Sequence, residues 1–325
     1  MKKNTLLSLC LAIVVVITVI VGASKFAPTP ATQKQSDPTA AQNFSLIVLP
    51  DTQIYAESFP EIFCEQTQWI VDNKEKLNIQ FVSQLGDIVN QGADDLNQWQ
   101  VASECLGKLE GQVPFAIVPG NHDVDRVSGS PATFKTYNAT FPLSRFYLYP
   151  WYRGDYIENQ NSYQVIHAGG ADFLFVNLEV DPPDDVLAWA NKVLQDNQDK
   201  KAIVTTHIFL EDGTGQRATS PHFRSESNSA EDIWQKLITQ NCNVFLVLSG
   251  HYHQADGENQ LDSTNSCGQS VHQVVQDYQS REKGGNGRLR IYTFQPTQNL
   301  INVQTYSPVT RTFEVDTDSQ FTLSY

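Results

Sequence analysis

The sequence predicts an α/β fold in which strands and helices alternate along most of the chain. Short apolar runs rich in β-branched residues recur between segments with helical periodicity. Candidate ligand residues follow the carboxyl ends of five of these runs, which is the edge where open α/β sheets build their sites. The 325 residues are enough for one large α/β domain or for two domains.

The N-terminal segment predicts export. A short basic region, residues 1–3, precedes an apolar run over residues 6–21. The end of this run suits cleavage by a signal peptidase, but the run is also long enough to span a bilayer if it stays uncut. Residues 1–23 are therefore a signal peptide or a signal anchor. The lysines at positions 2 and 3 keep the N-terminus in the cytoplasm, so we expect the remaining chain to be extracellular, periplasmic or membrane-anchored and facing outward.

A flexible linker is predicted over residues 24–43, and a folded domain over residues 44–325. The linker is rich in Pro, Thr, Gln and Ala and shows no apolar periodicity, so it cannot bury enough surface to fold. The folded body begins near Phe44, where the first apolar run starts.

The composition is acidic, with a formal net charge of −14 at pH 7. The charge becomes −16 when the two lysines leave with a cleaved signal, because −14 − 2 = −16 and the signal contains no acid. An acidic body argues against nucleic acid or an anionic membrane surface as the main partner. A small anionic substrate stays compatible, since bound metal ions would dominate the local field. We expect a monomer that meets a membrane only through an uncut N-terminal segment.

The first half of the body is predicted to contain three strands, at residues 44–49, 79–85 and 113–118. Each runs into polar residues that could bind a metal: Asp51, then Gly86-Asp87, then Gly120-Asn121-His122-Asp123. Helices are expected between these strands, at residues 61–74 and 94–109.

The second half of the body begins with an irregular aromatic stretch over residues 134–156. Further strands are predicted at 163–166, 173–178, 202–206 and 244–248, with helices at 186–194 and 231–239. The last two of these strands run into His207 and into Gly250-His251-Tyr252-His253. Residues 272–325 alternate in the manner of antiparallel strands.

The order of the polar segments is more informative than any one of them. An acid after a strand is often a helix N-cap, and a single histidine is usually structural. Taken in order, the five segments resemble the signatures DxH, GDxxx, GNH[DE], H and GHxH of the calcineurin-like metallophosphoesterases. The Pro50-Asp51-Thr52-Gln53 start, with Asp277-Tyr278-Gln279 and Gly284-Gly285-Asn286-Gly287 further on, resembles a bacterial branch of that family.

The resemblance implies a sandwich of two mixed sheets flanked by helices, with two divalent ions (Mn, Fe, Zn or Mg) at the strand-end edge. It implies a phosphoesterase that acts on a small phosphoester substrate through in-line attack of a metal-bridging hydroxide on phosphorus. Together with the N-terminal segment, this predicts an exported phosphoesterase. By resemblance, one ion would bind Asp51, Gln53, Asp87 and His253, and the other would bind Asp87, Asn121, His207 and His251.

Gln53 stands where most of the family has histidine. Asp51 and Gln53 are two residues apart at a strand end, so both side chains should leave one face and Gln53 should bind a metal through its oxygen. His251 and His253 should likewise share a face of an extended segment. The departure at Gln53 leaves an alternative open, a catalytically degenerate module with this fold that binds a phospho-ligand.

The resemblance gives His122 the role of general acid at the leaving-group oxygen, with Asp123 holding its other ring nitrogen. A structural histidine beside the ligands is the alternative. His167, His222 and His272 show no ligand spacing and are expected to be structural. Five arginines are candidate phosphate clamps, although a surface role is the default for each: Arg217, Arg224, Arg281, Arg288 and Arg290.

Four cysteines remain after the signal, an even count in a chain predicted to enter an oxidising compartment. Buried free thiols are the alternative to two disulfides. Because the expected fold should bring these segments together, we predict the pairs Cys64–Cys105 and Cys242–Cys267.

Overall fold

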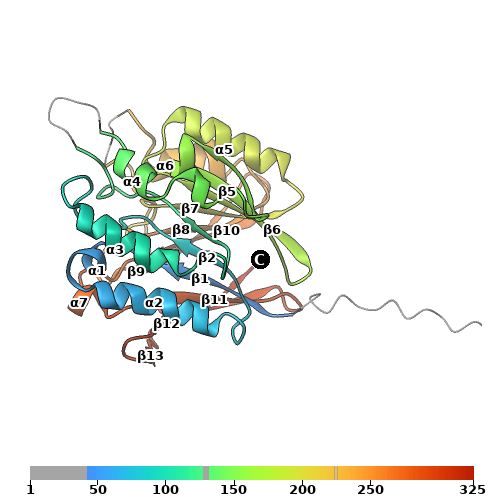
Figure 1. Ribbon diagram of the computed structural model, residues 1–325. Coiled ribbons are helices and arrows are strands. Elements are labelled where there is room, and N and C mark those ends of the chain that lie inside the picture. Colours follow the sequence, from blue (N-terminus) through green and yellow to red (C-terminus); the bar gives the residue numbers. More distant parts are fainter. Residues whose placement is uncertain (1–41, 127–131, 223, 225) are drawn as a thin grey trace, which may run out of the picture. The chain divides into compact units, whose positions relative to one another are not determined.

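The computed structural model describes residues 42–126, 132–222, 224 and 226–325 (Figure 1). All of them belong to one compact unit, Asp37–Tyr325. The predicted signal segment and all but the last two residues of the predicted linker lie outside the described residues. No helix among the described residues is long and apolar enough to cross a membrane.

Two seven-stranded sheets form the body of this unit. The first has the order β13-β12-β11-β1-β2-β3, with β14 beside β12, and comprises β1 (Phe44–Leu49), β2 (Ile79–Gln84), β3 (Phe115–Ile117), β11 (Leu289–Gln295), β12 (Leu300–Ser307), β13 (Thr312–Phe313) and β14 (Gln320–Ser324). The second has the order β4-β5-β6-β7-β8-β10-β9 and comprises β4 (Tyr152–Tyr156), β5 (Asn161–Ala168), β6 (Ala171–Leu178), β7 (Lys201–Thr206), β8 (Val244–Ser249), β9 (Glu258–Thr264) and β10 (Ser270–Gln276).

Both sheets are mixed. In the first, β1 runs parallel to β2 and antiparallel to β11. In the second, β7 runs parallel to β6 and β8, whereas β9 is antiparallel to β10. The predicted sandwich of two mixed sheets is therefore confirmed.

Helices connect the strands and flank the sheets (Figure 1). They are α1 (Gln53–Ser58), α2 (Pro60–Asn73), α3 (Leu96–Gly107), α4 (Lys135–Thr140), α5 (Asp184–Asp196), α6 (Ala230–Ile233) and α7 (Glu282–Gly285), with single turns η1 (Leu143–Arg145), η2 (Glu158–Gln160) and η3 (Trp234–Ile238). The helices α2 and α3 lie beside the first sheet, and α5 lies beyond the second, as the predicted alternation of elements requires.

Strand β1 shows why the sequence folds this way. Successive side chains of a strand point to opposite faces, so Leu46 and Val48 enter one apolar cluster while Ile47 and Leu49 enter another. The first cluster lies between the sheets, where Phe81 of β2 stacks on Phe175 of β6 with ring centroids 3.8 Å apart. The second cluster holds the apolar faces of α2 and α3. Because both faces are covered, the strand reads as an unbroken apolar run.

The C-terminal part departs from the prediction in one respect. Strands β11 to β14 pair antiparallel as expected, but β10 runs parallel to β8. The chain reaches β10 through β9, whose sequence ENQLDST carries too few apolar residues to be recognised as a strand. Parallel pairing brings the carboxyl end of β10 to the same edge as that of β8, which matters for the site.

Both predicted disulfides are present. Cys64 of α2 bonds to Cys105 of α3, and their Cα atoms are 4.5 Å apart. Cys242 bonds to Cys267 with Cα atoms 5.7 Å apart. The first joins two successive helices, and the second closes a loop around β8 and β9.

Candidate metal centre

The predicted ligands come together at the carboxyl ends of the strands. Asp87, His207 and His251 each place one ligand atom within 4.8 Å of the others. Asp87 Oδ2 lies 3.2 Å from His207 Nε2, and Asn121 Oδ1 lies 3.1 Å from the same nitrogen. These four residues follow β2, β7, β8 and β3. Strands β2 and β3 are parallel in the first sheet and β7 and β8 are parallel in the second, so each pair brings its ligands to one edge of its own sheet. The contact between Asp87 and His207 joins these two edges.

His207 is fully buried, and its contacts fit a metal ligand. Its Nδ1 donates to the carbonyl of Leu85 at 2.9 Å, so Nε2 faces Asp87 and Asn121. Burial would lower the pKa of His207, but Asp87 outweighs it and raises that pKa, and a cation bound there would replace the proton on Nε2. Three acceptor atoms cannot satisfy one another without a cation or a proton between them. The donor set therefore fits a divalent ion.

The charges of the site interact strongly before any ion binds. Burial would raise the pKa of Asp87, but the neighbouring His207 outweighs it and lowers that pKa to about 2. Burial and His207 lower the pKa of His251 to about 3. Near neutral pH, Asp87 is therefore an anion and His251 a neutral imidazole, the forms that bind metals.

The side of the centre near β1 is rich in oxygen. Asp51 is buried, and its Oδ2 accepts the backbone N–H of His251 at 3.1 Å. The amide Nε2 of Gln53 donates to Gln279 Oε1, while Gln53 Oε1 is buried and has no hydrogen-bond partner. Burial and then the carboxylate of Asp277 raise the pKa of Asp51 well above its ordinary value.

Asp277 is a residue that the sequence analysis did not place in the site. It follows β10 directly, as the predicted ligands follow their strands. Its carboxyl group lies within hydrogen-bonding reach of Asp51, and burial raises its pKa to about 7. The rule that found the other acids would have found Asp277 had the parallel pairing of β10 been recognised.

Two geometric reasons given for the ligands were wrong, although the residues do lie at the site. Gln53 is the first residue of α1, so it does not extend the strand that precedes Asp51. His251 has a left-handed φ of 69°, so it and His253 do not share the face of an extended segment. His253 instead turns its Nδ1 to the hydroxyl of Ser280.

At two positions only glycine fits, because a carboxyl group of the site lies close to the backbone. A Cβ at Gly120 would collide with the carboxyl group of Asp87, and a Cβ at Gly250 would collide with Asp51 Oδ1. Any larger residue at either position would therefore displace one of the acids.

His122 lies at the rim of the centre. Its backbone N–H donates to Asp87 Oδ1 at 2.8 Å, and its ring Nδ1 donates to the carbonyl of Asn90 at 2.9 Å. A backbone carbonyl can only accept, so Nδ1 carries the proton. The ring nitrogen Nε2 is left to act on a substrate.

The predicted pairing of Asp123 with the His122 ring was wrong. The Asp123 carboxylate accepts the backbone N–H groups of Ile88, Val89 and Gly120 at 3.1, 3.0 and 2.8 Å. Burial and then the charge of Asp87 raise its pKa to about 7. Asp123 thus ties the loop after β2 to the loop after β3 and acts on His122 only through the backbone.

A polar pocket of about 330 Å³ opens beside His122. It is lined by Asn90, Gln91, Gly92, Ala93, Asp94, Asn121, His122, Val124 and Arg126. A leaving group placed here would be within reach of His122.

His222 also reaches the centre, against the expectation of a purely structural role. Its ring centroid lies 5.0 Å from that of His251, and its Nε2 lies 3.3 Å from the hydroxyl of Tyr252. His222 and Tyr252 line a second pocket of about 440 Å³ that also includes Glu211 and Asp212. No spacing in the sequence could reveal this, because His222 lies on a long loop between β7 and α6.

The five candidate arginines are engaged with acids. Arg217 pairs with Glu231, Arg224 with Glu179, Arg281 and Arg288 with Glu314, and Arg290 with Glu258. The side chain of Arg290 is 0% exposed, so the expected surface position was wrong for it.

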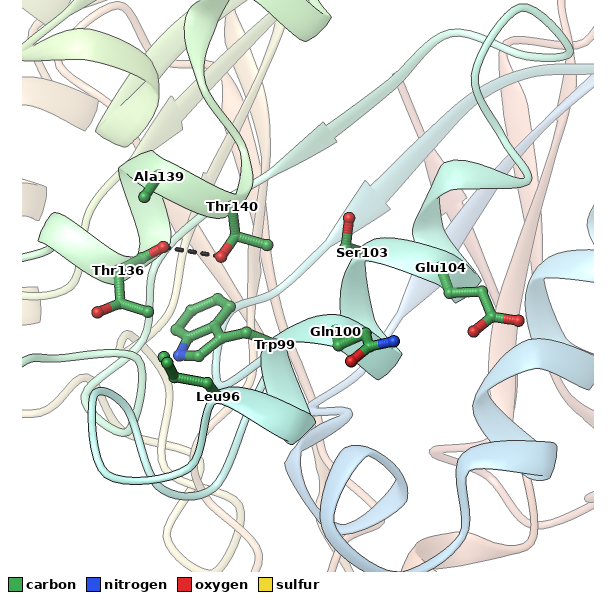
Figure 2. A pocket seen from close by; sticks show the side chains of 8 residues that line it. All are labelled: Leu96, Trp99, Gln100, Ser103, Glu104, Thr136, Ala139 and Thr140. Carbon is green, nitrogen blue, oxygen red and sulfur yellow. Dashed lines mark hydrogen bonds between the residues drawn. The ribbon is translucent and has the colours of Figure 1, made fainter.

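A further hollow of about 500 Å³ lies between α3 and α4 (Figure 2). Figure 2 shows Trp99 at its base, with Thr140 donating to the carbonyl of Thr136 at 2.8 Å across one wall. None of the predicted ligands lines it, so we assign no chemistry to it.

Comparisons with known proteins agree with this geometry. The profile of the family described as calcineurin-like phosphoesterase matches residues 44–255. The uncharacterized protein YvnB of Bacillus subtilis (strain 168) is 36% identical over 275 residues, covering 83% of this chain. The chain spans only 20% of the length of that relative.

Two solved structures share the fold. The purple acid phosphatase PPD1 from yellow lupin (Lupinus luteus) seeds superposes with a TM-score of 0.55 at 13% identity, covering 89% of this chain and 55% of its own. A dimetal phosphatase from Danio rerio gives a TM-score of 0.51 at 13% identity, covering 89% of this chain and 100% of its own.

Proposed function

The chain belongs to the calcineurin-like phosphoesterase family, whose members are hydrolases acting on phosphoric ester bonds, and we propose that it is an exported phosphoesterase with a two-metal centre. One observation carries the proposal: Asp87, Asn121, His207 and His251 converge from four strand ends with acceptor atoms facing one another. Two divalent ions bound there would activate a water molecule and neutralise the charge that develops on phosphorus.

The chain's own residues account for the other requirements. The Asp87 carboxylate, which lies 3.2 Å from His207, would bridge the two ions. His122, held by the carbonyl of Asn90, would donate a proton from Nε2 to the leaving oxygen. The polar pocket beside His122 would receive the leaving alcohol.

Export is part of the proposal. The basic and apolar N-terminal segment supports it. So do the two disulfides, since such bonds persist mainly in oxidising compartments.

The test is metal reconstitution of the chelated protein with Mn²⁺, Zn²⁺ or Mg²⁺. We expect hydrolysis of p-nitrophenyl phosphate or bis(p-nitrophenyl) phosphate to return with metal and to be absent in Asp87→Asn. Asp172→Asn is a matched control, because this half-exposed acid at the start of β6 pairs with His167 of β5, at the end of the strand away from the ligands. Full activity of Asp87→Asn would refute the proposal, and metal binding without turnover on either ester would favour the alternative of a binding module.

A further inference from the structure

One loop contacts three of the residues expected to hold a single ion. Residues 277–280 follow β10, and within this loop Asp277 lies against Asp51, Gln279 accepts the amide of Gln53, and Ser280 meets His253. The family profile ends at residue 255, so its match does not cover this loop.

One side-chain oxygen of Asp277 has no hydrogen-bond partner. Its Oδ1 accepts the backbone N–H of Gln279 at 2.9 Å. Its Oδ2 is buried and has no hydrogen-bond donor, and the whole residue is only 1% exposed. A buried carboxylate oxygen without a donor is costly unless a proton or a cation meets it.

Gln53, which contacts the same loop, carries a second unpartnered oxygen. Gln53 is 3% exposed, its Nε2 donates to Gln279 Oε1, and its Oε1 has no hydrogen-bond donor. Gln279 in turn donates its backbone N–H to Asp277 Oδ1, and Asp277 lies against Asp51. These contacts tie the oxygen-bearing side chains of Gln53, Asp277 and Asp51 to one another on the β1 side of the centre.

The surrounding structure holds Asp277 in this position. Its backbone N–H donates to the carbonyl of Gly257 at 2.8 Å. The next residue, Tyr278, is fully buried, and its hydroxyl donates to Glu258 at 2.7 Å. Glu258 is itself paired with the buried Arg290. These contacts hold Asp277 beside Asp51, as surrounding hydrogen bonds orient the ligands of a metal site.

We propose that Asp277 is a ligand of the metal ion held by Asp51 and Gln53, and that Gln279 is a positioning residue that turns Gln53 Oε1 toward that ion. The proposal rests on the proposed two-metal centre. Asp277 supplies the charge that the neutral amide of Gln53 lacks. A site with three oxygen donors favours Mn²⁺, Mg²⁺ or Ca²⁺ over Zn²⁺.

The test measures metal binding without substrate. The full chain is chelated, then titrated with Mn²⁺ by calorimetry, with bound Mn²⁺ counted by elemental analysis. We expect two equivalents for the wild type and for Asp262→Asn, an exposed acid on β9 that pairs with His272. Asp277→Asn should lose one equivalent or bind it at least about tenfold more weakly. Unchanged stoichiometry and affinity in Asp277→Asn would overturn the proposal.

Gln279 has its own pair of variants. Gln279→Met removes the acceptor for Gln53 and should weaken one site by about 10- to 100-fold, whereas Gln279→Glu keeps an acceptor and should restore binding. Equal binding by Gln279→Met and the wild type would refute the positioning role.

If Asp277 were structural, Asp277→Asn would lower the melting temperature of the chelated protein. We expect the melting temperature to stay unchanged, because Asp277 Oδ2 makes no hydrogen bond that holds the fold. A clear fall would indicate that Asp277 holds the fold. If Asp277→Asn does not fold, anomalous scattering from Mn²⁺-loaded wild-type crystals decides, since an ion within about 2.6 Å of Asp277 Oδ2 supports the proposal and any longer distance overturns it.

The outcomes separate this proposal from the proposed function. Two equivalents of metal that depend on Asp277, without ester hydrolysis, would leave the ligand assignment standing and refute the activity. Ester hydrolysis by the wild type, together with normal metal binding by Asp277→Asn, would support the proposed function and refute the assignment of Asp277 as a ligand.

Discussion

Replacing His122 with alanine should separate catalysis from metal binding. The contact between this residue and the centre is made by its backbone N–H, which donates to Asp87 Oδ1 at 2.8 Å and which alanine keeps. The ring makes its hydrogen bond to the carbonyl of Asn90, at the wall of the pocket. His122→Ala should therefore retain both ions while it loses the group that serves the leaving oxygen.

The magnitude follows from the ring's two functions. Loss of a general acid should lower kcat on an alkyl phosphate by about 10²- to 10⁴-fold, which corresponds to about 2.7–5.4 kcal/mol of transition-state free energy. Loss of the bond to Asn90 should lower the free energy of unfolding by only about 0.5–1.5 kcal/mol.

The assay compares two leaving groups. With p-nitrophenyl phosphate, whose leaving group needs no proton, the loss in His122→Ala should shrink to less than about tenfold. Because Nδ1 already donates to Asn90, only the imidazolium form can donate from Nε2.

His167→Ala is the matched control, since that half-exposed histidine pairs with Asp172. It should leave both rates and the metal content unchanged. If metal content falls in step with activity in His122→Ala, or if both esters lose the same factor, His122 is structural and the reasoning fails.

Three further predictions concern the framework of the site. Gly250→Ala should weaken metal binding in a Mn²⁺ titration with the fold preserved by circular dichroism, because the added Cβ displaces the carboxylate of Asp51; unchanged affinity would contradict this. Arg290→Met should lower the free energy of unfolding in urea by about 3–5 kcal/mol, because it leaves the buried charge of Glu258 without its partner. A loss below about 1 kcal/mol, typical of an exposed pair, would show that this buried ion pair does not stabilise the fold. Burial, and then neighbouring carboxylates, raise the pKa of Asp51 and raise the pKa of Asp123 to about 7. The folded chain therefore binds more protons at these two groups than the unfolded chain. The chelated protein should therefore lose on the order of 1 kcal/mol of stability as pH rises from about 6.5 to about 8, and a gain over this range would reverse the assigned sign.

The central strands could be predicted from the sequence because both of their faces are covered, and the family resemblance supplied the arrangement in two sheets. Strands such as β1 and β8 are almost entirely apolar and end at polar ligand residues, so both their position and their function are visible. Strand β9 was missed because its exposed face is polar and its interior face contributes few apolar residues. Without β9, the parallel pairing of β10 could not be anticipated.

Local geometry at the site depended on contacts that sequence spacing does not contain. The chain turns into α1 at Gln53, and two residues later Tyr55 is buried with its hydroxyl accepting the backbone N–H of Gly287, 232 positions away. The carboxylate of Asp123 accepts backbone N–H groups of the loop after β2, in which Asp87 adopts a left-handed φ of 46°. Residue types at strand ends could be predicted, but the conformation of the loops that carry them could not.

The two halves of the centre differ in the chemistry of their donors, and this difference bears on which ions the chain selects. In the proposed centre, Asp51, Gln53 and Asp277 offer oxygen beside the single imidazole of His253, whereas the other half offers the two imidazoles of His207 and His251 beside the oxygen of Asn121. Oxygen donors suit Mn²⁺ and Mg²⁺, and imidazoles suit Zn²⁺ and iron. Burial and neighbouring groups set the protonation and charge of the ligands in each half. The metal preference of each half is therefore a property of the fold. A glutamine in place of the family's histidine therefore sharpens the contrast between the halves, because it removes the nitrogen donor expected beside Asp51 and leaves an oxygen there.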